Sequence, residues 1–160
     1  MQKILAEKKA IITGANQGLG FEIAKKYVLA GADVMLCARN ATLLDKARSE
    51  LEVMATPGQK IMGDVADVSS ELDVRALVAN TLEALGGCHI LVNNAGAAWG
   101  EPIEEFSELG WDKVMDLNVK SMFFVTQKFL PLLKKGSTKD NPSRVINIGS
   151  IDGINTPAFE

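Results

Sequence analysis

A glycine-rich turn, Thr13-Gly14-Ala15-Asn16-Gln17-Gly18-Leu19-Gly20, follows the short apolar run Ala10-Ile11-Ile12 and precedes a segment with the apolar spacing of a helix. One glycine of such a turn permits a tight reversal, a second lets a pyrophosphate approach the backbone, and a third lets the helix pack closely on a sheet. The first N–H groups of the helix and the positive end of its dipole then face the anion. The turn therefore predicts a phosphate-binding loop. Taken alone, the glycines also fit a strand-to-helix turn without a ligand.

Apolar runs of four to six residues alternate with longer segments of helical period along the chain. The runs predict strands over 10–13, 33–38, 59–63, 90–93 and 144–148, and the longer segments predict helices over 18–30, 43–54, 71–85 and 111–133. Thr42 and Ser70 are predicted N-caps, and Gly31, Gly86 and Gly136 are predicted helix stops. Such alternation is typical of βαβ units. We therefore expect an α/β fold with a doubly wound parallel sheet.

The composition is that of a soluble globular protein, and we expect a single domain over residues 1–160, since 47% of the residues are hydrophobic and 23% are charged. A formal net charge of −3, with scattered lysines and arginines, disfavours nucleic-acid binding. No apolar run reaches the roughly 18 residues of a membrane span, and the charged N-terminus differs from a secretory signal, so a cytoplasmic location is expected. Cys37 and Cys88 are predicted core residues, and His89 is a predicted capping or surface residue rather than a metal ligand.

Polar or glycine-containing clusters follow the ends of the predicted strands. In chain order they are the glycine turn, Arg39-Asn40, Asp64-Val65, Asn93-Asn94-Ala95-Gly96 and Gly149-Ser150. Parallel strands of one sheet point the same way, so these clusters share the edge at which doubly wound sheets bind ligands. Each cluster alone is compatible with ordinary loop chemistry, but five clusters at one edge favour a dinucleotide site.

Four motifs occur along nearly the whole chain in a fixed order. They are Thr13-Gly14-x-x-x-Gly18-x-Gly20, Asn93-Asn94-Ala95-Gly96, Asp116-Leu117-Asn118-Val119 and Ile146-Asn147-Ile148-Gly149-Ser150. This combination resembles the short-chain dehydrogenase/reductase family. The resemblance implies a Rossmann fold, a nicotinamide cofactor and reversible hydride transfer between an alcohol and a carbonyl compound. It also implies that the full-length form is a homo-oligomer.

The residues after the second predicted strand bear on the identity of the cofactor. A carboxylate there would accept hydrogen bonds from the ribose 2′-hydroxyl of NAD and repel a 2′-phosphate, but this chain has Ala38 followed by Arg39. A guanidinium can hold a phosphate through two parallel hydrogen bonds, so NADP(H) is the expected cofactor. By the resemblance, Asp64 and Val65 border the adenine and Asn93 approaches the adenosine ribose, while 94–96 brace the central strands. The candidate cofactor-binding residues are Gly14, Asn16, Gln17, Gly18, Leu19, Gly20, Arg39, Asn40, Asp64, Val65, Asn93, Ala95 and Gly96.

The same resemblance implies catalysis by Asn, Ser, Tyr and Lys, in which the tyrosine exchanges a proton with a substrate oxygen that the serine holds. Asn118 matches the asparagine that orients the lysine through water, and Ser150 matches the oxygen-binding serine. The alternatives are a helix-interior amide and a strand-end hydroxyl without a catalytic role. The chain reaches Glu160 without a Tyr-x-x-x-Lys after Ser150, and its one tyrosine, Tyr27, belongs to the first predicted helix. We therefore expect a sheet that is incomplete at its C-terminal side and a 160-residue chain that is inactive on its own.

The resemblance, together with Arg39, implies an NADP(H)-dependent oxidoreductase that interconverts an alcohol and a ketone, and the breadth of the family suggests a 3-oxoacyl or another hydrophobic carbonyl compound as its small-molecule substrate. Two alternatives remain open. One is a non-catalytic fragment that binds NADP(H), and the other is a structural subunit that completes its sheet with a partner chain.

Overall fold

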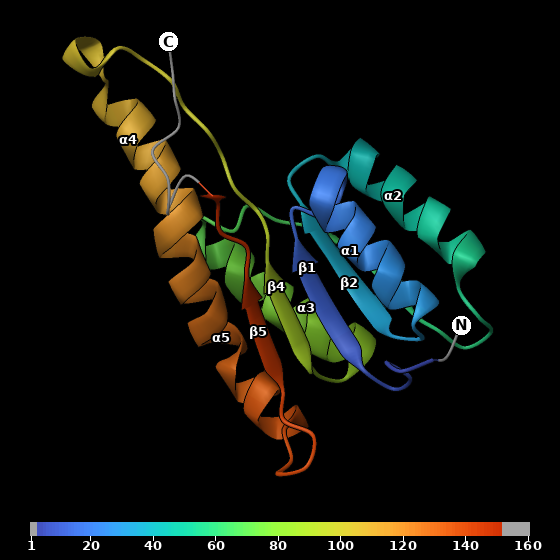
Figure 1. Ribbon diagram of the computed structural model, residues 1–160. Helices are drawn as coiled ribbons and strands as arrows, with labels where there is room; N and C mark the ends of the chain where they lie inside the picture. The colour runs from blue at the N-terminus through green and yellow to red at the C-terminus, as the bar shows by residue number, and fades with distance from the viewer. Residues whose placement is uncertain (1–2, 152–160) are drawn as a thin grey trace.

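Five parallel strands form one sheet in the computed structural model, which describes residues 3–151 (Figure 1). The strand order is β3-β2-β1-β4-β5. The strands are β1 (Lys9–Thr13), β2 (Asp33–Ala38), β3 (Ile61–Val65), β4 (Ile90–Asn93) and β5 (Arg144–Asn147). The chain runs outward from β1 to β3 and then returns to place β4 on the other side of β1. This reversal is the switch point of a doubly wound sheet, as the sequence predicted.

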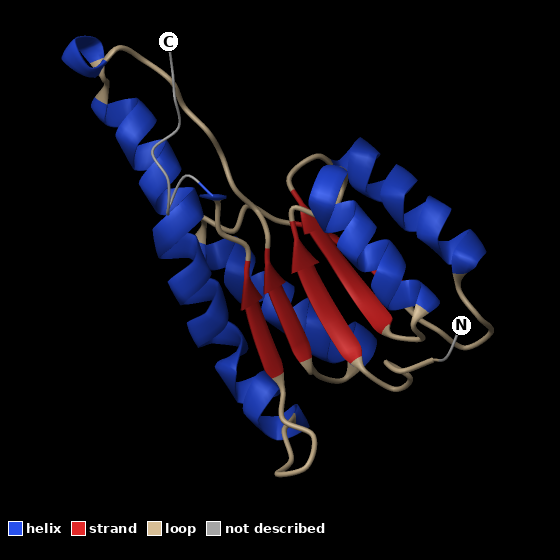
Figure 2. Ribbon diagram, viewed as in Figure 1, coloured by secondary structure: helices blue, strands red, loops and turns tan. Residues whose placement is uncertain are grey.

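Helices cover both faces of the sheet (Figure 2). One face is covered by α1 (Gly18–Leu29) and α2 (Ala41–Met54), and the other by α3 (Glu71–Leu85) and α5 (Ser121–Gly136). A short 3₁₀ turn, η1 (Ile103–Glu105), and α4 (Glu108–Met115) extend beyond the sheet in Figure 1. No helix within residues 3–151 is long and apolar enough to span a bilayer.

The central strands contribute side chains to two separate hydrophobic clusters. Ile12 and Leu36 belong to the cluster under α1 and α2, whereas Ile11 and Met35 belong to the cluster under α3 and α5. Neighbouring residues of a strand point to opposite faces of a sheet, so each central strand is buried on both sides. This explains why these strands are continuously apolar in the sequence. Cys37 and Cys88 are buried in the second cluster, which confirms their assignment to the core.

The start of α2 differs from the sequence prediction. Asn40, not Thr42, is the N-cap, because its side-chain oxygen accepts a hydrogen bond of 2.9 Å from the backbone N–H of Leu43. Asparagine and threonine both cap helices well, so residue type alone does not show which of the two positions is the N-cap. The N-cap predicted at Ser70 and the left-handed stop at Gly86 are confirmed.

Strand β3 begins two residues later than predicted, at Ile61 instead of residue 59. Gln59 lies in the preceding turn, where its side-chain amide donates hydrogen bonds to the backbone oxygens of Val28 and Ala32. The backbone N–H of Lys60 donates to the carboxylate of Asp33. These contacts with distant residues determine where the strand starts, and therefore which residues follow its end.

The helix predicted over 111–133 is longer and contains a π-helical turn. It begins at Glu108, because Ser107 caps it by accepting a hydrogen bond from the N–H of Gly110, and it continues to Gly136. The π-helical turn, η2 (Asp116–Lys120), joins α4 to α5. Such turns often occur at functional sites.

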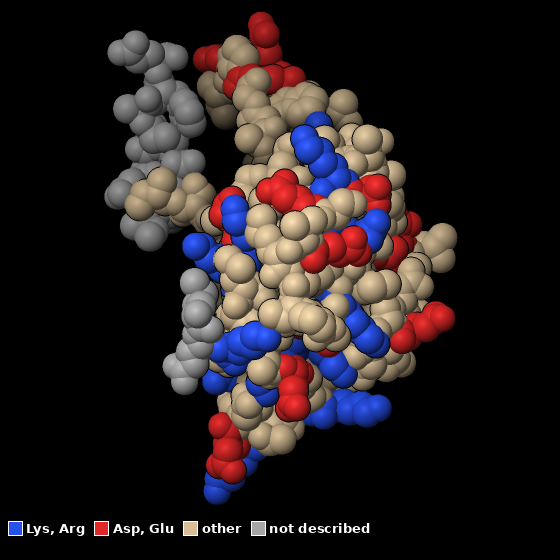
Figure 3. All heavy atoms as spheres, turned by 90° about the vertical axis from the view of Figure 1, so that its right-hand side faces the viewer, with Lys and Arg blue, Asp and Glu red and all other residues tan. Residues whose placement is uncertain are grey.

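Acidic and basic side chains are interspersed on the side of the molecule shown in Figure 3. On α2, for example, Arg48 pairs with both Asp45 and Glu52. Pairs of this kind on a helix surface each contribute a few tenths of a kcal/mol, about 0.3–0.5 kcal/mol. Because the charges alternate, this side of the molecule has no extended region of purely positive or purely negative electrostatic potential.

Candidate functional site

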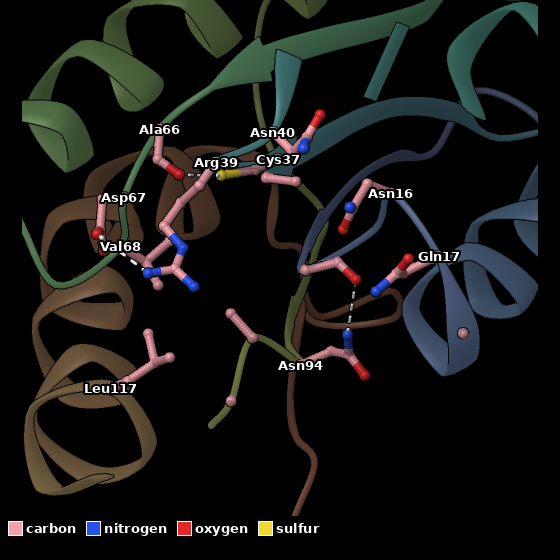
Figure 4. Close-up of a pocket in the computed structure, with 15 residues that line it drawn as sticks. Asn16, Gln17, Cys37, Arg39, Asn40, Ala66, Asp67, Val68, Asn94 and Leu117 are labelled. Atoms are coloured by element: carbon pink, nitrogen blue, oxygen red, sulfur yellow. Dashed lines mark hydrogen bonds and ion pairs between the residues drawn. The ribbon is translucent and has the colours of Figure 1, made fainter. Parts of the chain in front are cut away.

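A cavity of about 380 Å³ lies at the carboxyl edge of the sheet, where residues from the ends of β1, β2, β3 and β4 meet (Figure 4). The strand-order reversal between β1 and β4 leaves such an opening in doubly wound folds. The cavity is lined by Gly14, Asn16, Gln17, Gly18, Cys37, Ala38, Arg39, Asn40, Ala66, Asp67, Val68, Asn94, Ala95, Gly96 and Leu117.

The three glycines of the turn have different local roles. Gly14 and Gly18 have left-handed φ angles of +64° and +60°, which favour glycine. A Cβ on Gly18 would meet open space beside the cavity. A Cβ on Gly20 would lie 2.4 Å from both the carbonyl oxygen of Gly14 and the side-chain nitrogen of Asn94. Gly20 therefore permits close packing of α1 against the end of β1, and it lies outside the cavity lining.

Asn94 clamps the glycine turn from the neighbouring strand. Its side-chain amide donates hydrogen bonds of 2.9 and 3.2 Å to the backbone oxygens of Thr13 and Gly14. In return, the Thr13 hydroxyl accepts hydrogen bonds from the N–H groups of Asn94 and Ala95. These bonds match the predicted bracing role of 94–96. Asn94, Ala95 and Gly96 also line the cavity, so the segment both braces the strands and borders the site.

The N-terminus of α1 is open toward the cavity. Gln17 occupies the N-cap position but makes no capping hydrogen bond with its side chain, and the first turn of α1 contains no acidic residue. The first N–H groups of the helix are therefore left for another acceptor. The neighbouring Leu19 is largely exposed and lies outside the lining.

The third strand presents a different Asp-Val pair to the cavity than the one predicted. Asp64 and Val65 lie within β3 and outside the lining, and the Asp64 carboxylate accepts a hydrogen bond from the side chain of Asn80. Asp67 and Val68 follow the strand and line the cavity. The sequence reads Asp-Val-Ala-Asp-Val, and the predicted strand 59–63 ends directly before the first pair, whereas the observed strand Ile61–Val65 contains it. The predicted N-cap at Ser70 indicates the second pair, because Asp67-Val68 lie just before the helix that it starts.

Asn93 does not reach the cavity, in contrast to the prediction that it approaches a ribose. It is 3% exposed, and its side-chain nitrogen donates hydrogen bonds to Thr126 (3.0 Å) and to the side chain of Asn147 (2.8 Å). It thereby connects β4 with α5 and β5. Strand alternation is the physical reason, because Asn93 points to one face of the sheet while the backbone that follows turns toward the site.

Opposite charges face each other in the cavity. The guanidinium of Arg39 lies 3.8 Å from the carboxylate of Asp67. Burial alone would raise the pKa of Asp67, but hydrogen bonds from the hydroxyl and the N–H of Ser69, together with the charge of Arg39, hold that pKa below its usual value. Burial raises the pKa of the Cys37 thiol to about 12, with further contributions from nearby aspartates. Asp67 is therefore anionic at neutral pH, and Cys37 is a protonated thiol.

The two predicted catalytic residues lie on the side of the site toward β5. Asn118 belongs to η2, and its side chain both accepts from and donates to the backbone of Ala97, at 2.8 Å in each case. A Cβ on Gly96 would lie only 3.3 Å from the Asn118 side-chain oxygen. Asn118 therefore holds the loop that follows β4. Ser150 lies beyond the end of β5 and is exposed.

The site fits the phosphate and sugar groups of a dinucleotide. An uncapped helix N-terminus, a glycine turn with open space at Gly18 and a cation at Arg39 border the same cavity. Main-chain N–H groups and a guanidinium are suitable donors for phosphate oxygens. The arrangement can hold an extended anionic ligand along the edge of the sheet.

A family model described as short chain dehydrogenase matches residues 8–159. The 3-oxoacyl-[acyl-carrier-protein] reductase of rhamnolipid biosynthesis from Pseudomonas aeruginosa is 42% identical over 154 residues, covering 94% of this chain and 57% of that protein. Gluconate 5-dehydrogenase of Gluconobacter oxydans is 38% identical over 123 residues, covering 77% of this chain and 47% of that enzyme.

Solved structures give the same result. The Pseudomonas aeruginosa RhlG/NADP active-site complex has a TM-score of 0.91 and 40% identity, and the match covers 99% of this chain and 60% of that one. A 7α-hydroxysteroid dehydrogenase complexed with NADH and 7-oxo glycochenodeoxycholic acid has a TM-score of 0.87 and 30% identity, and the match covers 98% of this chain and 58% of that one. The chain thus spans about three fifths of the length of the relatives that it matches most fully.

Proposed function

Because this chain belongs to the short-chain dehydrogenase family, we propose that it binds NADP(H) and forms the nucleotide-binding part of an oxidoreductase that interconverts a carbonyl compound and an alcohol. The observation that carries the proposal is the cavity at the switch point, with a glycine turn on one side and Arg39 on the other. When bound, NADP(H) supplies or accepts the hydride. The neighbourhoods of Gly14, Gly18 and the first turn of α1 would hold its pyrophosphate, and 66–68 would border its adenine.

Preference for a 2′-phosphorylated nucleotide follows from the residues at the end of β2. Ala38 offers no carboxylate to a free ribose, and the Arg39 guanidinium is positioned at the cavity to pair with a phosphate. Asn40 lines the same region, but its side-chain oxygen is already used to cap α2. The NADP complex of the Pseudomonas relative supports this preference.

The substrate is proposed to be a hydrophobic carbonyl compound, with a 3-oxoacyl thioester as the first candidate. The name of the Pseudomonas reductase supports that class. Asn118 would act as a positioning residue through the loop after β4, and Ser150 would hold the substrate oxygen. Non-catalytic binding of NADP(H) is the second candidate, since the one tyrosine of the 160 residues, Tyr27, packs in α1 against the core.

Fluorescence titration with NADPH and NADH tests the cofactor proposal. The unmodified chain is expected to bind NADPH more tightly, and the double substitution Ala38→Asp with Arg39→Ala is expected to reverse the order. Hydrogen bonds to charged groups contribute about 1.5–3 kcal/mol, so the change in preference is about tenfold or more. Arg48→Ala on α2 is the matched control, because Arg48 lies outside the cavity. An unmodified chain that prefers NADH contradicts the proposal.

A further inference from the structure

An ion pair in the lining of the cavity joins the segments that follow two neighbouring strands. Arg39 directly follows β2, and Asp67 lies in the segment between β3 and α3. Figure 4 shows the Arg39 side chain directed toward Asp67, and the guanidinium and carboxylate are 3.8 Å apart. The cation that would receive a 2′-phosphate is therefore already oriented toward an anion of the protein.

The two partners differ in how firmly they are held. One carboxylate oxygen of Asp67 accepts hydrogen bonds from the N–H (2.9 Å) and the hydroxyl (2.6 Å) of Ser69. The backbone of Asp67 is held as well, since its N–H donates to Asp73 and its carbonyl accepts from Ser70. The carboxylate is thus fixed, and its second oxygen faces Arg39. The Arg39 side chain is 64% exposed and its long chain can rotate.

We propose that Asp67 is a specificity-determining residue that weakens the preference of this site for 2′-phosphorylated nucleotides by competing for Arg39. The inference rests on the proposed binding of NADP(H). A 2′-phosphate must draw the guanidinium away from Asp67 or share it, and it also meets the negative charge of that carboxylate. A nucleotide with a free 2′-hydroxyl meets neither cost. Asp67 therefore narrows the difference in affinity between the two kinds of nucleotide.

The expected size of the effect is modest because the pair is exposed to solvent. Exposed ion pairs and charge repulsions of this kind change equilibria by factors of up to about five. The effect decreases with added salt, because mobile ions screen exposed charges. Contacts with the adenine and the ribose are common to both ligands and cancel in the ratio of their affinities.

Isothermal titration with 2′,5′-ADP and 5′-AMP at low ionic strength tests the proposal without any turnover. Asp67→Asn keeps an oxygen that accepts from Ser69 and removes the charge. It is expected to raise the ratio of the affinity for 2′,5′-ADP to the affinity for 5′-AMP about two- to fivefold. Asp67→Ser, which also suits this turn, is a second variant with the same expected direction. Asp64→Asn is the matched control, since Asp64 begins the other Asp-Val pair and lies outside the lining.

Three outcomes separate the possibilities. A chain that binds neither ligand overturns the proposed function and this inference together. Tight binding of 2′,5′-ADP by the parent, with an unchanged or lower ratio in both Asp67 variants, overturns the inference alone. Competition for Arg39 also requires that Asp67→Asn has a smaller effect in an Arg39→Ala background, and an undiminished effect there contradicts it.

Discussion

Strands β4 and β5 are neighbours in the same sheet, yet their surroundings differ completely. They pair in parallel with Leu91 opposite Val145 and Val92 opposite Ile146. All four residues of β4 are buried, whereas all four residues of β5 are exposed. Strand β4 lies between β1 and β5, and β5 forms an edge of the sheet within residues 3–151.

The difference shows that strand pairing by itself does not bury a strand. Burial requires a neighbour on each side and helices over both faces. The cavity lies at the carboxyl ends of β1, β2, β3 and β4, of which β1, β2 and β4 are buried and the other edge strand, β3, is largely exposed. Near β5, apolar side chains remain exposed on η2 and α5, including Val119, Phe123 and Leu130. The central strands β1, β2 and β4 are buried by the chain's own elements, whereas the β5 half, defined here as β5, η2 and α5 with Asn118 and Ser150, exposes apolar side chains.

The largest effect that we expect concerns catalysis. The 160-residue chain should oxidise NADPH with hydrophobic ketones at least about 10²–10⁴-fold more slowly than the Pseudomonas 3-oxoacyl reductase assayed in parallel, because a positioned general acid contributes a factor of this size. Its one tyrosine lies in α1, on the nucleotide side. Absorbance of NADPH follows the reaction. Comparable turnover by the two proteins would show that the β5 half of this chain suffices for proton transfer.

Substitutions at two paired strand positions measure how much each side chain contributes to the free energy of unfolding. Leu91→Ala should lower the free energy of unfolding by about 2–5 kcal/mol, because a fully buried side chain leaves a cavity. Val145→Ala, at the opposite register position, should cost about 0.5 kcal/mol, because Val145 is 41% exposed. Urea denaturation of both variants gives the two values. Equal losses would mean that β5 is as well covered as β4.

Substitutions at two glycines of the turn should differ in how much they lower the stability of the fold. Gly20→Ala should destabilise the fold by about 1–3 kcal/mol, because its Cβ meets the backbone of Gly14 and the side chain of Asn94. Gly18→Ala places its Cβ in open space, so its cost is the left-handed backbone, about 1 kcal/mol. Circular dichroism melts and nucleotide titrations check both. Stronger destabilisation by Gly18→Ala than by Gly20→Ala contradicts this assignment.

We expect the chain to self-associate through the exposed apolar side chains of the β5 half. Phe123 is exposed and packs edge-to-face against Phe124, with ring centroids 5.2 Å apart. We expect Phe123→Glu to weaken association about tenfold, which corresponds to about 1.4 kcal/mol. Val53→Glu on α2 is the control, since Val53 is a similarly exposed apolar residue on the other side of the sheet. Light scattering across a dilution series measures the change, and a compact monomer at all concentrations argues against an interface here.

The smallest expected effect is a pH dependence of the free energy of unfolding, which arises from His89 near the starts of β1 and β4. The ring nitrogen Nδ1 of His89 accepts a hydrogen bond from the N–H of Lys9. Burial lowers the pKa of His89, and the charges of Lys8 and Lys9 lower it further. Protonation is therefore favoured in the unfolded chain, and stability should fall as pH decreases below about 6.5. Urea midpoints of the parent and of His89→Asn between neutral and mildly acidic pH check this, and parallel curves would exclude His89 as the cause.

Much of the architecture followed from local patterns. The apolar runs predict five strands within about two residues of their observed positions, and the residue types of Ser70 and Gly86 predict the two ends of α3. Burial of the central strands on both faces makes them continuously apolar, which is a strong signal. The glycine turn and Arg39 were placed at one edge because parallel strands share a direction, and the structure brings both to the cavity.

The remaining assignments depended on contacts between distant parts of the chain. The structure presents Asp67 to the cavity instead of Asp64, because Gln59 is anchored to backbone groups more than twenty residues away and delays the start of β3. Asn93 is buried between strands because Thr126 and Asn147 supply its hydrogen-bond partners. Residue type and spacing therefore determined the elements and the chemistry of the edge. Tertiary structure decided which side chains face the ligand, because the end of a strand and the direction of a side chain depend on what packs against them.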